Sequence, residues 1–276
     1  DPFNEIDSPS WDPETLAEMS RSIFGSMTSA DPDAVWLQMG WLFYADPTHW
    51  TDENIRAYLT AVPQGRMILL DYYCEFIQIW KQTESFYGQP YIWCYLGNFG
   101  GNTMISGNFR TVSERITETF SNGQPNVYGI GSTLEGFGVN QFMYEYVLGR
   151  AWKTGLSDQE WISRLADRRV GAVDDAAKVA YKDLVDKIYL DYSITGQATL
   201  TSAHPCLEGN WMWTTRPGRS WSVADIMGVW EKFMQVNSNE DSYLYDLVNV
   251  GRQALGDLFL DLRDEFTKAY KAGNYA

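Results

Sequence analysis

Carboxylates are the side chains of this sequence that are best placed to do chemistry. The 276 residues include 36 Asp and Glu, but only two histidines, His49 and His204, and three cysteines. Two histidines so far apart exclude a His-x-x-x-His zinc motif and argue against a histidine-centred triad. Three cysteines are too few for a disulfide framework. A reaction at this protein would therefore depend on Asp or Glu, and we expect neither a metal nor an organic cofactor.

Two glutamates lie where catalytic groups occur in folds that alternate strands and helices. Glu5, preceded by Asn4, lies where a first strand should end, and the carboxyl ends of strands form the active site in such folds. In sugar-cleaving barrels such a glutamate is the proton donor, and we expect Asn4 beside it to hydrogen-bond the substrate. Because two-residue matches are common by chance, the dipeptide alone fits an ordinary exposed glutamate better. Glu135 follows the last strand-like run, and Gly136 after it lets the backbone turn sharply. An ordinary loop glutamate is the alternative for Glu135.

Four further residues at expected strand ends suit a carbohydrate ligand. Trp41 and Trp93 could stack on the apolar face of a sugar ring, although most of the 12 tryptophans must belong to the core. Asp71 places a charge at the end of an apolar strand. Asn98 begins an Asn-Phe-Gly-Gly-Asn turn whose amides could bond hydroxyl or acetamido groups, or could serve the turn alone.

Short apolar runs with helical stretches between them predict a parallel sheet in the first half of the chain. The helical pattern is clearest over residues 13–27 and 52–59. With the stub that ends at Glu5 we expect five βα strands, which fit either an open sheet or a (β/α)₈ barrel that lacks three strands. The four complete runs are residues 35–39, 67–71, 91–95 and 126–130.

After about residue 155 the pattern becomes helical. Ser157 and Glu160 form a capping-box signature, and apolar residues recur at helical spacing in four segments. We therefore expect an all-α second half and divide the chain into domains 1–155 and 156–276. Residues 195–220, rich in Gly, Pro, Thr and Trp, predict a long loop that could form one wall of a binding site.

The acidic composition excludes several classes of partner. With 21 Lys and Arg against 36 Asp and Glu, the formal charge at pH 7 is −15. Such a surface repels phosphate backbones and anionic lipids. No apolar run approaches the roughly 20 residues that span a bilayer. We expect no nucleic-acid partner and no membrane partner.

Taken as a set, the motifs resemble glycoside hydrolase family 89, the α-N-acetylglucosaminidases. They occur in the order and approximate spacing of that family, and the resemblance covers most of residues 1–190. Beyond residue 195 it thins. The set consists of Asp1-Pro-Phe-Asn-Glu5, Val35-Trp-Leu-Gln-Met-Gly-Trp-Leu-Phe43, Pro90-Tyr-Ile-Trp-Cys-Tyr-Leu-Gly-Asn-Phe-Gly-Gly-Asn102, Leu134-Glu-Gly136, Trp161 and Arg168-Arg-Val-Gly171.

The resemblance implies the C-terminal part of a (β/α)₈ TIM barrel followed by the start of an α-helical domain. It implies a retaining hydrolase that removes terminal α-linked N-acetylglucosamine from a glycan, with Glu5 as acid/base and Glu135 as nucleophile. It also implies that Trp41, Asp71 and Tyr72 line the sugar site. Because a barrel that lacks three strands exposes two sheet edges and part of its core, we expect the remainder of the barrel to be needed for activity.

Two other functions stay open. One is a retaining glycosidase for a different terminal sugar, and the other is a non-catalytic carbohydrate-binding barrel, against which the presence of both glutamates argues. The family implies a secreted or periplasmic protein in bacteria and a lysosomal one in animals. The lack of an Asn-x-Ser/Thr sequon and the few cysteines favour a bacterial source.

Overall fold

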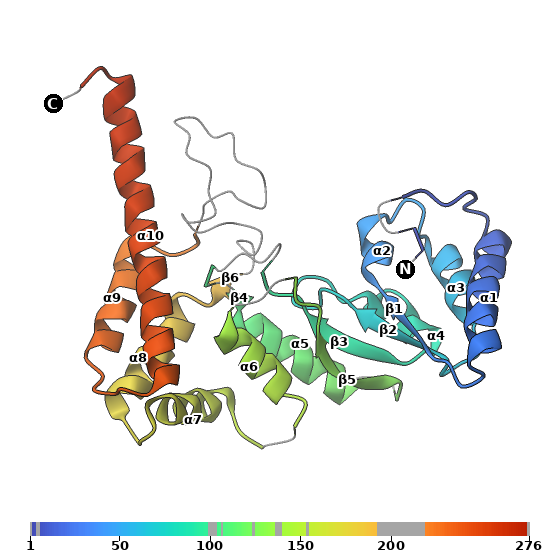
Figure 1. Cartoon of the computed structure of the whole chain (residues 1–276), viewed down its shortest axis with the longest axis horizontal. Coiled ribbons are helices and arrows are strands. Elements are labelled where there is room, and N and C mark those ends of the chain that lie inside the picture. The colour runs from blue at the N-terminus through green and yellow to red at the C-terminus, as the bar shows by residue number, and fades with distance from the viewer. Residues whose placement is uncertain are drawn as a thin grey trace. The chain divides into compact units, whose positions relative to one another are not determined.

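The computed structural model contains two compact units, which we describe separately. The first unit comprises Asp1–Leu96, Thr111–Thr133 and Tyr144–Trp152, and the second Gly97–Arg110, Leu134–Met143 and Lys153–Ala276. Figure 1 shows the elements of both along the chain. The structure describes residues 2–3, 6–98, 104–105, 107–122, 125–135, 140–152, 155–191 and 219–274.

Four parallel strands form the sheet of the first unit: β1 (Trp36–Met39), β2 (Met67–Asp71), β3 (Tyr91–Tyr95) and β5 (Val127–Ser132). They confirm the four apolar runs predicted from the sequence, to within two residues. The strand order is β1-β2-β3-β5, and every neighbouring pair is parallel. Because parallel strands share a direction, the residues that follow all four strands emerge at one edge of the sheet.

Helices α1 (Pro13–Ala30) and α3 (Asp52–Thr60) confirm the two helical patterns of the first half. Asp12 and Thr51 cap them, since each side chain accepts a hydrogen bond from a backbone N–H of the first turn. Their apolar faces share one core cluster with β1 and β2. The other helices of this part of the chain were not predicted individually from the sequence: α2 (Trp41–Ala45), η1 (Ile79–Lys81), α4 (Glu84–Tyr87), α5 (Phe109–Asn122) and α6 (Gln141–Gly149).

Two glycines are required by close approach within the sheet. Gly40, directly after β1, donates its N–H to the carbonyl oxygen of Leu70 at 2.8 Å. A Cβ atom at Gly40 would lie only 2.8 Å from that same oxygen. In β5, a Cβ at Gly131 would lie 2.9 Å from Cγ2 of Ile92. Both positions therefore need a residue without a side chain, so that neighbouring strands keep their spacing.

Four helices form most of the second unit, as the pattern after residue 155 predicts: α7 (Asp158–Val170), α8 (Asp175–Lys187), α9 (Val223–Met234) and α10 (Asp241–Lys271). Phe233 of α9 lies at the centre of their packing. Its ring centroid is 4.9 Å from that of Tyr181 in α8 and 6.3 Å from that of Tyr243 in α10. All three rings are buried.

The ends of α7 follow the signals in the sequence. The side chain of Ser157 accepts from the backbone N–H of Glu160, and the carboxylate of Glu160 accepts from the N–H of Ser157, which completes the capping box. Gly171 ends the helix in a left-handed conformation. The described part of this unit also contains one short antiparallel pair, β4 (Gly107–Asn108) with β6 (Leu190–Asp191).

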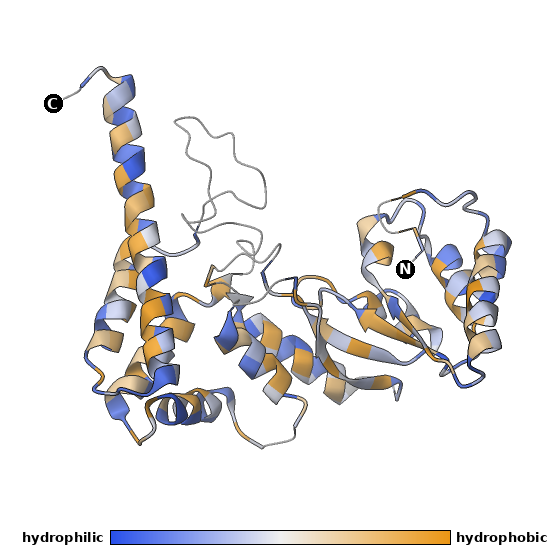
Figure 2. Ribbon diagram, viewed as in Figure 1, coloured by the Kyte–Doolittle hydropathy of each residue, from blue (hydrophilic) through white to orange (hydrophobic). Residues whose placement is uncertain are grey.

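Helix α10 has one buried face and one exposed apolar face. The hydropathy colours of Figure 2 show apolar residues along the whole helix. Val250 and Ala254 are buried. No helix among the described residues is long and apolar enough to cross a membrane. The exposed apolar side chains of α10 include Val248, Leu255, Phe259, Leu262 and Phe266.

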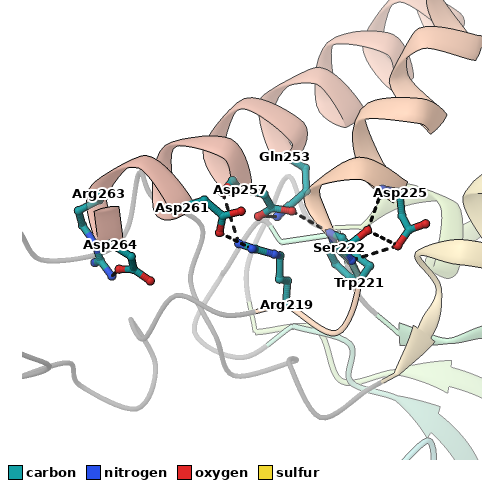
Figure 3. A network of polar contacts seen from close by, with 9 residues as sticks. All are labelled: Arg219, Trp221, Ser222, Asp225, Gln253, Asp257, Asp261, Arg263 and Asp264. Atoms are coloured by element: carbon teal, nitrogen blue, oxygen red, sulfur yellow. Dashed lines mark hydrogen bonds and ion pairs between the residues drawn. The ribbon is translucent and has the colours of Figure 1, made fainter. Parts of the chain in front are cut away.

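A buried carboxylate organises the polar side of α10, as Figure 3 shows. Asp257 accepts from the indole N–H of Trp221 at 2.8 Å and from the amide of Gln253 at 2.9 Å. Burial raises the pKa of Asp257. Arg219 forms an ion pair with Asp261 one turn further along the helix. These bonds hold residues 219–221 against α10.

Candidate active site

The predicted acid/base Glu5 and its neighbour Asn4 lie outside the described residues. Phe3, two residues earlier, lies edge-on to Trp11 with ring centroids 6.1 Å apart, and 6.5 Å from the ring of Trp50. Trp50 is itself buried. Phe3 therefore packs against the core of the first unit, a contact that was not predicted from the sequence.

The predicted nucleophile Glu135 is exposed. It lies three residues after the end of β5, in a segment with no regular secondary structure. Residues 136–139 lie outside the described residues, and so do residues 195–218 of the predicted loop wall.

An aromatic cluster lies at the carboxyl ends of β1 and β2. Trp41 begins α2, and its ring centroid lies 5.9 Å from that of Tyr72 and 5.1 Å from that of Tyr44. Tyr44 in turn contacts Phe76, with ring centroids 5.8 Å apart. Trp41 and Tyr72 are both partly exposed, so part of each ring can meet the apolar face of a sugar. Tyr44 and Phe76 were not among the residues predicted from the sequence, although Tyr44 follows Trp41 at helical spacing.

Asp71 is fully buried at the end of β2. Its Oδ1 accepts from the N–H of Ile79 at 3.1 Å, and its Oδ2 accepts from the N–H of Trp80 at 3.3 Å. Burial raises the pKa of Asp71 to about 6, although the two backbone donors favour the charged form. Asp71 therefore holds the chain that leaves β2, and it exposes no atom to a ligand.

The substitution Asp71→Asn is expected to remove a pH dependence of stability. The pKa of Asp71 is about 6 in the folded state, above the ordinary value of 3.8. Below pH 6 the folded state therefore binds a proton that the unfolded state does not yet bind. Between pH 7 and pH 5 this uptake raises the free energy of unfolding by about 1 kcal/mol in the wild type, and not in the variant. Urea unfolding of both proteins at the two pH values measures the difference, and equal changes would contradict the assignment.

Two other residues predicted to bind sugar are also buried. Trp93 is fully buried, and its indole N–H donates to Oε1 of Gln78 at 3.1 Å. Asn98 is fully buried as well, and its amide donates to the carbonyl of Met104 at 2.6 Å. In this structure both side chains form hydrogen bonds inside the protein. Neither exposes a surface that a sugar could contact.

Glu75, which the sequence analysis missed, links the ends of β2 and β3. Both of its carboxylate oxygens accept from the N–H of Leu96, at 3.0 and 3.2 Å, and the side chain is buried. Tyr144 of α6 donates its hydroxyl to the carbonyl of the same Leu96. Arg115 of α5 donates to the carbonyl of Cys74 at 2.8 Å. The available signal was a single charge within the apolar run that follows β2.

The described residues limit the chemistry available at this edge of the sheet. No three His, Cys, Asp or Glu side chains gather as metal ligands among them. In the second unit, Glu135 presents an exposed carboxylate three residues after β5. In the first unit, Trp41 and Tyr72 form a partly exposed aromatic pair after β1 and β2. A carboxylate can act as a nucleophile or carry a proton, and the rings can bind a sugar, so the residues suit a reaction on a carbohydrate.

Two family models match this chain. The alpha-N-acetylglucosaminidase (NAGLU) tim-barrel domain matches residues 1–154, and the NAGLU C-terminal domain matches residues 161–276. Human alpha-N-acetylglucosaminidase is 32% identical over 284 residues, which cover 98% of this chain and 37% of the human protein.

Solved structures of a family 89 glycoside hydrolase from Clostridium perfringens share the fold. Two of them align with TM-scores of 0.83 and 0.84 at 21% and 22% identity, and cover 99% of this chain and 30% of theirs. The chain thus spans about a third of the length of these relatives. Since the NAGLU barrel model alone matches residues 1–154, more than half of the chain, the protein belongs to the alpha-N-acetylglucosaminidase (NAGLU) family, with part of a TIM barrel followed by a helical domain.

Proposed function

We propose that this chain carries the catalytic carboxylates of a retaining exo-glycosidase that hydrolyses terminal, non-reducing α-linked N-acetylglucosamine. Glu5 acts as the acid/base, Glu135 acts as the nucleophile, and Trp41 and Tyr72 bind the sugar. The observation that carries the proposal is the match of the NAGLU barrel model over residues 1–154, a range that includes both glutamates.

The ligands of the relatives support an N-acetylglucosamine substrate. One Clostridium perfringens structure, in which two glutamates are replaced by glutamine, is a complex with its substrate GlcNAc-alpha-1,4-galactose. Two others are complexes with PUGNAc and with 2-acetamido-1,2-dideoxynojirmycin. A substrate complex obtained with two glutamates removed fits a reaction that needs both of them.

The stereochemistry of the substrate explains why the protein must supply a nucleophile. In a β-linked N-acetylglucosaminide, the acetamido group of the sugar can attack the anomeric carbon from the face opposite the leaving group. In the α-anomer the acetamido group and the leaving group are on the same face, so this attack is impossible. A carboxylate of the protein must then attack the anomeric carbon, and we assign this role to Glu135.

The proposed reaction has two steps. Glu5 donates its proton to the glycosidic oxygen while Glu135 attacks the anomeric carbon, so the C–O bond breaks and a β-linked glycosyl ester forms. Glu5, now a carboxylate, takes a proton from water, and the water oxygen displaces Glu135 to release the α-anomer of the sugar. Retaining enzymes hold the two carboxyl groups about 5–5.5 Å apart for this purpose.

The proposal predicts that the full-length protein containing this chain hydrolyses 4-nitrophenyl α-N-acetylglucosaminide. Because each step inverts the anomeric carbon, the first sugar released should be the α-anomer, which ¹H NMR detects before mutarotation. The matched β-anomer of the substrate should not be hydrolysed. Release of the β-anomer would contradict the retaining mechanism. Faster turnover of another α-glycoside would indicate a different sugar, and binding without turnover would indicate a carbohydrate-binding protein.

A further inference from the structure

We propose that Thr133 is a positioning residue for the nucleophile, an inference that rests on the proposed role of Glu135. Thr133 directly follows β5 and lies two residues before Glu135. A chain spans at most about 3.6 Å per residue, so the point where the segment leaves the sheet limits where Glu135 can reach. A displacement of about 1 Å at a reacting group is enough to lower a rate by about 10²-fold.

Two hydrogen bonds fix Thr133 at the end of the sheet. Its N–H donates to the carbonyl of Tyr95 at 3.0 Å, which extends the β3–β5 pairing by one residue. Its Oγ1 donates to the carbonyl of Tyr72 at 2.6 Å. Because β3 lies between β2 and β5, this second bond crosses the end of β3 and joins two strand ends that share no strand pairing.

The acceptor of the second bond is itself held in place. Asp71, directly before Tyr72, is buried and bonded to the N–H groups of Ile79 and Trp80. The ring of Tyr72 lies 5.9 Å from that of Trp41. The hydroxyl of Thr133 thus connects the segment that leads to Glu135 with the backbone of Tyr72. Tyr72 is one of the two aromatic residues to which we assign sugar binding.

Two substitutions separate the hydroxyl of Thr133 from its shape. Thr133→Val keeps the β-branched shape but cannot donate, so it leaves the Tyr72 carbonyl without this bond. We expect kcat on 4-nitrophenyl α-N-acetylglucosaminide to fall about 10- to 100-fold in this variant, with KM changed less than about threefold. Thr133→Ser keeps the donor, and its kcat should stay within about threefold of the wild type. Equal losses in the two variants would overturn the proposal.

The effect of Thr133→Val in a second protein, the Glu135→Gly variant, tests whether Thr133 acts through Glu135. In Glu135→Gly with added azide, the attacking group is not attached to the chain, so adding Thr133→Val should lower the azide-dependent rate less than about threefold. An equal cost of Thr133→Val in both backgrounds would indicate a general loosening of the fold and would overturn the positioning role alone. Full activity of Glu135→Gly without azide would show instead that the nucleophile itself is wrongly assigned.

Discussion

Turnover of 4-nitrophenyl α-N-acetylglucosaminide should fall by about 10⁴-fold or more in Glu135→Gly, because no carboxylate is then available to attack the anomeric carbon. Azide should restore turnover, since the lost side chain leaves room for a small anion on the same face of the sugar. The product should be the β-glycosyl azide, because a single displacement inverts the α-linked centre. Absorbance at the nitrophenolate band gives the rate, and ¹H NMR gives the configuration.

The isosteric variant Glu135→Gln is the matched control. Its amide is a poor nucleophile but fills the space of the carboxylate, so it should be as inactive as Glu135→Gly and should not respond to azide. Undiminished activity of Glu135→Gly would remove Glu135 from the reaction. An α-glycosyl azide product would instead assign the acid/base role to Glu135.

Glu5→Gln is expected to separate substrates by their leaving groups. The second sugar of a disaccharide would leave as an alkoxide, so it needs a proton donor. We therefore expect kcat/KM on a disaccharide to fall by about 10²–10⁴-fold. From 2,4-dinitrophenyl α-N-acetylglucosaminide, the 2,4-dinitrophenolate leaves without protonation. We therefore expect kcat/KM on this substrate to fall less than about tenfold. Its kcat should still fall, because the glycosyl ester then waits for water without a base. Steady-state rates on the two substrates measure this contrast.

Asp7→Asn removes an exposed carboxylate two residues from Glu5 and serves as the control for charge alone. We expect Asp7→Asn to change kcat/KM only slightly, and by the same factor for both substrates. Azide added to Glu5→Ala should yield the α-glycosyl azide, the opposite anomer from Glu135→Gly, because azide then attacks the glycosyl ester. Equal losses on both substrates in Glu5→Gln would contradict the assignment of Glu5 as the acid.

The long elements of the fold could be predicted because their apolar residues recur at a readable period. Strands β1, β2, β3 and β5 and helices α7 to α10 all have this property. Helix α2 has five residues and α4 has four, too few for a period of 3.6 to be recognised. Helix α6 is apolar on most of its surface, so it lacks an alternation of faces. Helix α5 does have apolar residues at helical spacing, Phe109, Val112, Ile116 and Phe120, so its pattern was readable and was overlooked.

The candidate site was harder to predict, for a different reason. Sequence patterns locate a strand end, but they do not say whether the side chain there turns to solvent or into the loop that follows. Trp41 is partly exposed, whereas Asp71 and Trp93 are buried by chain segments whose path no pattern encodes. The bond of Thr133 joins residues 61 positions apart, so no local signal could have found it.

In the proposed site, the bonds of Thr133 also keep the residue that would determine sugar specificity independent of the segment that would position the nucleophile. Tyr72 and Tyr95 contribute only carbonyl oxygens, which every amino acid possesses. The side chain of Tyr72 can therefore be exchanged, by evolution or by design, without loss of the acceptor that holds the segment before Glu135. Under the proposed role of Tyr72 in sugar binding, variation at position 72 is expected to change which sugar is accepted while the proposed nucleophile stays where it is. Position 133 has no such freedom, because only serine offers a hydroxyl of similar reach.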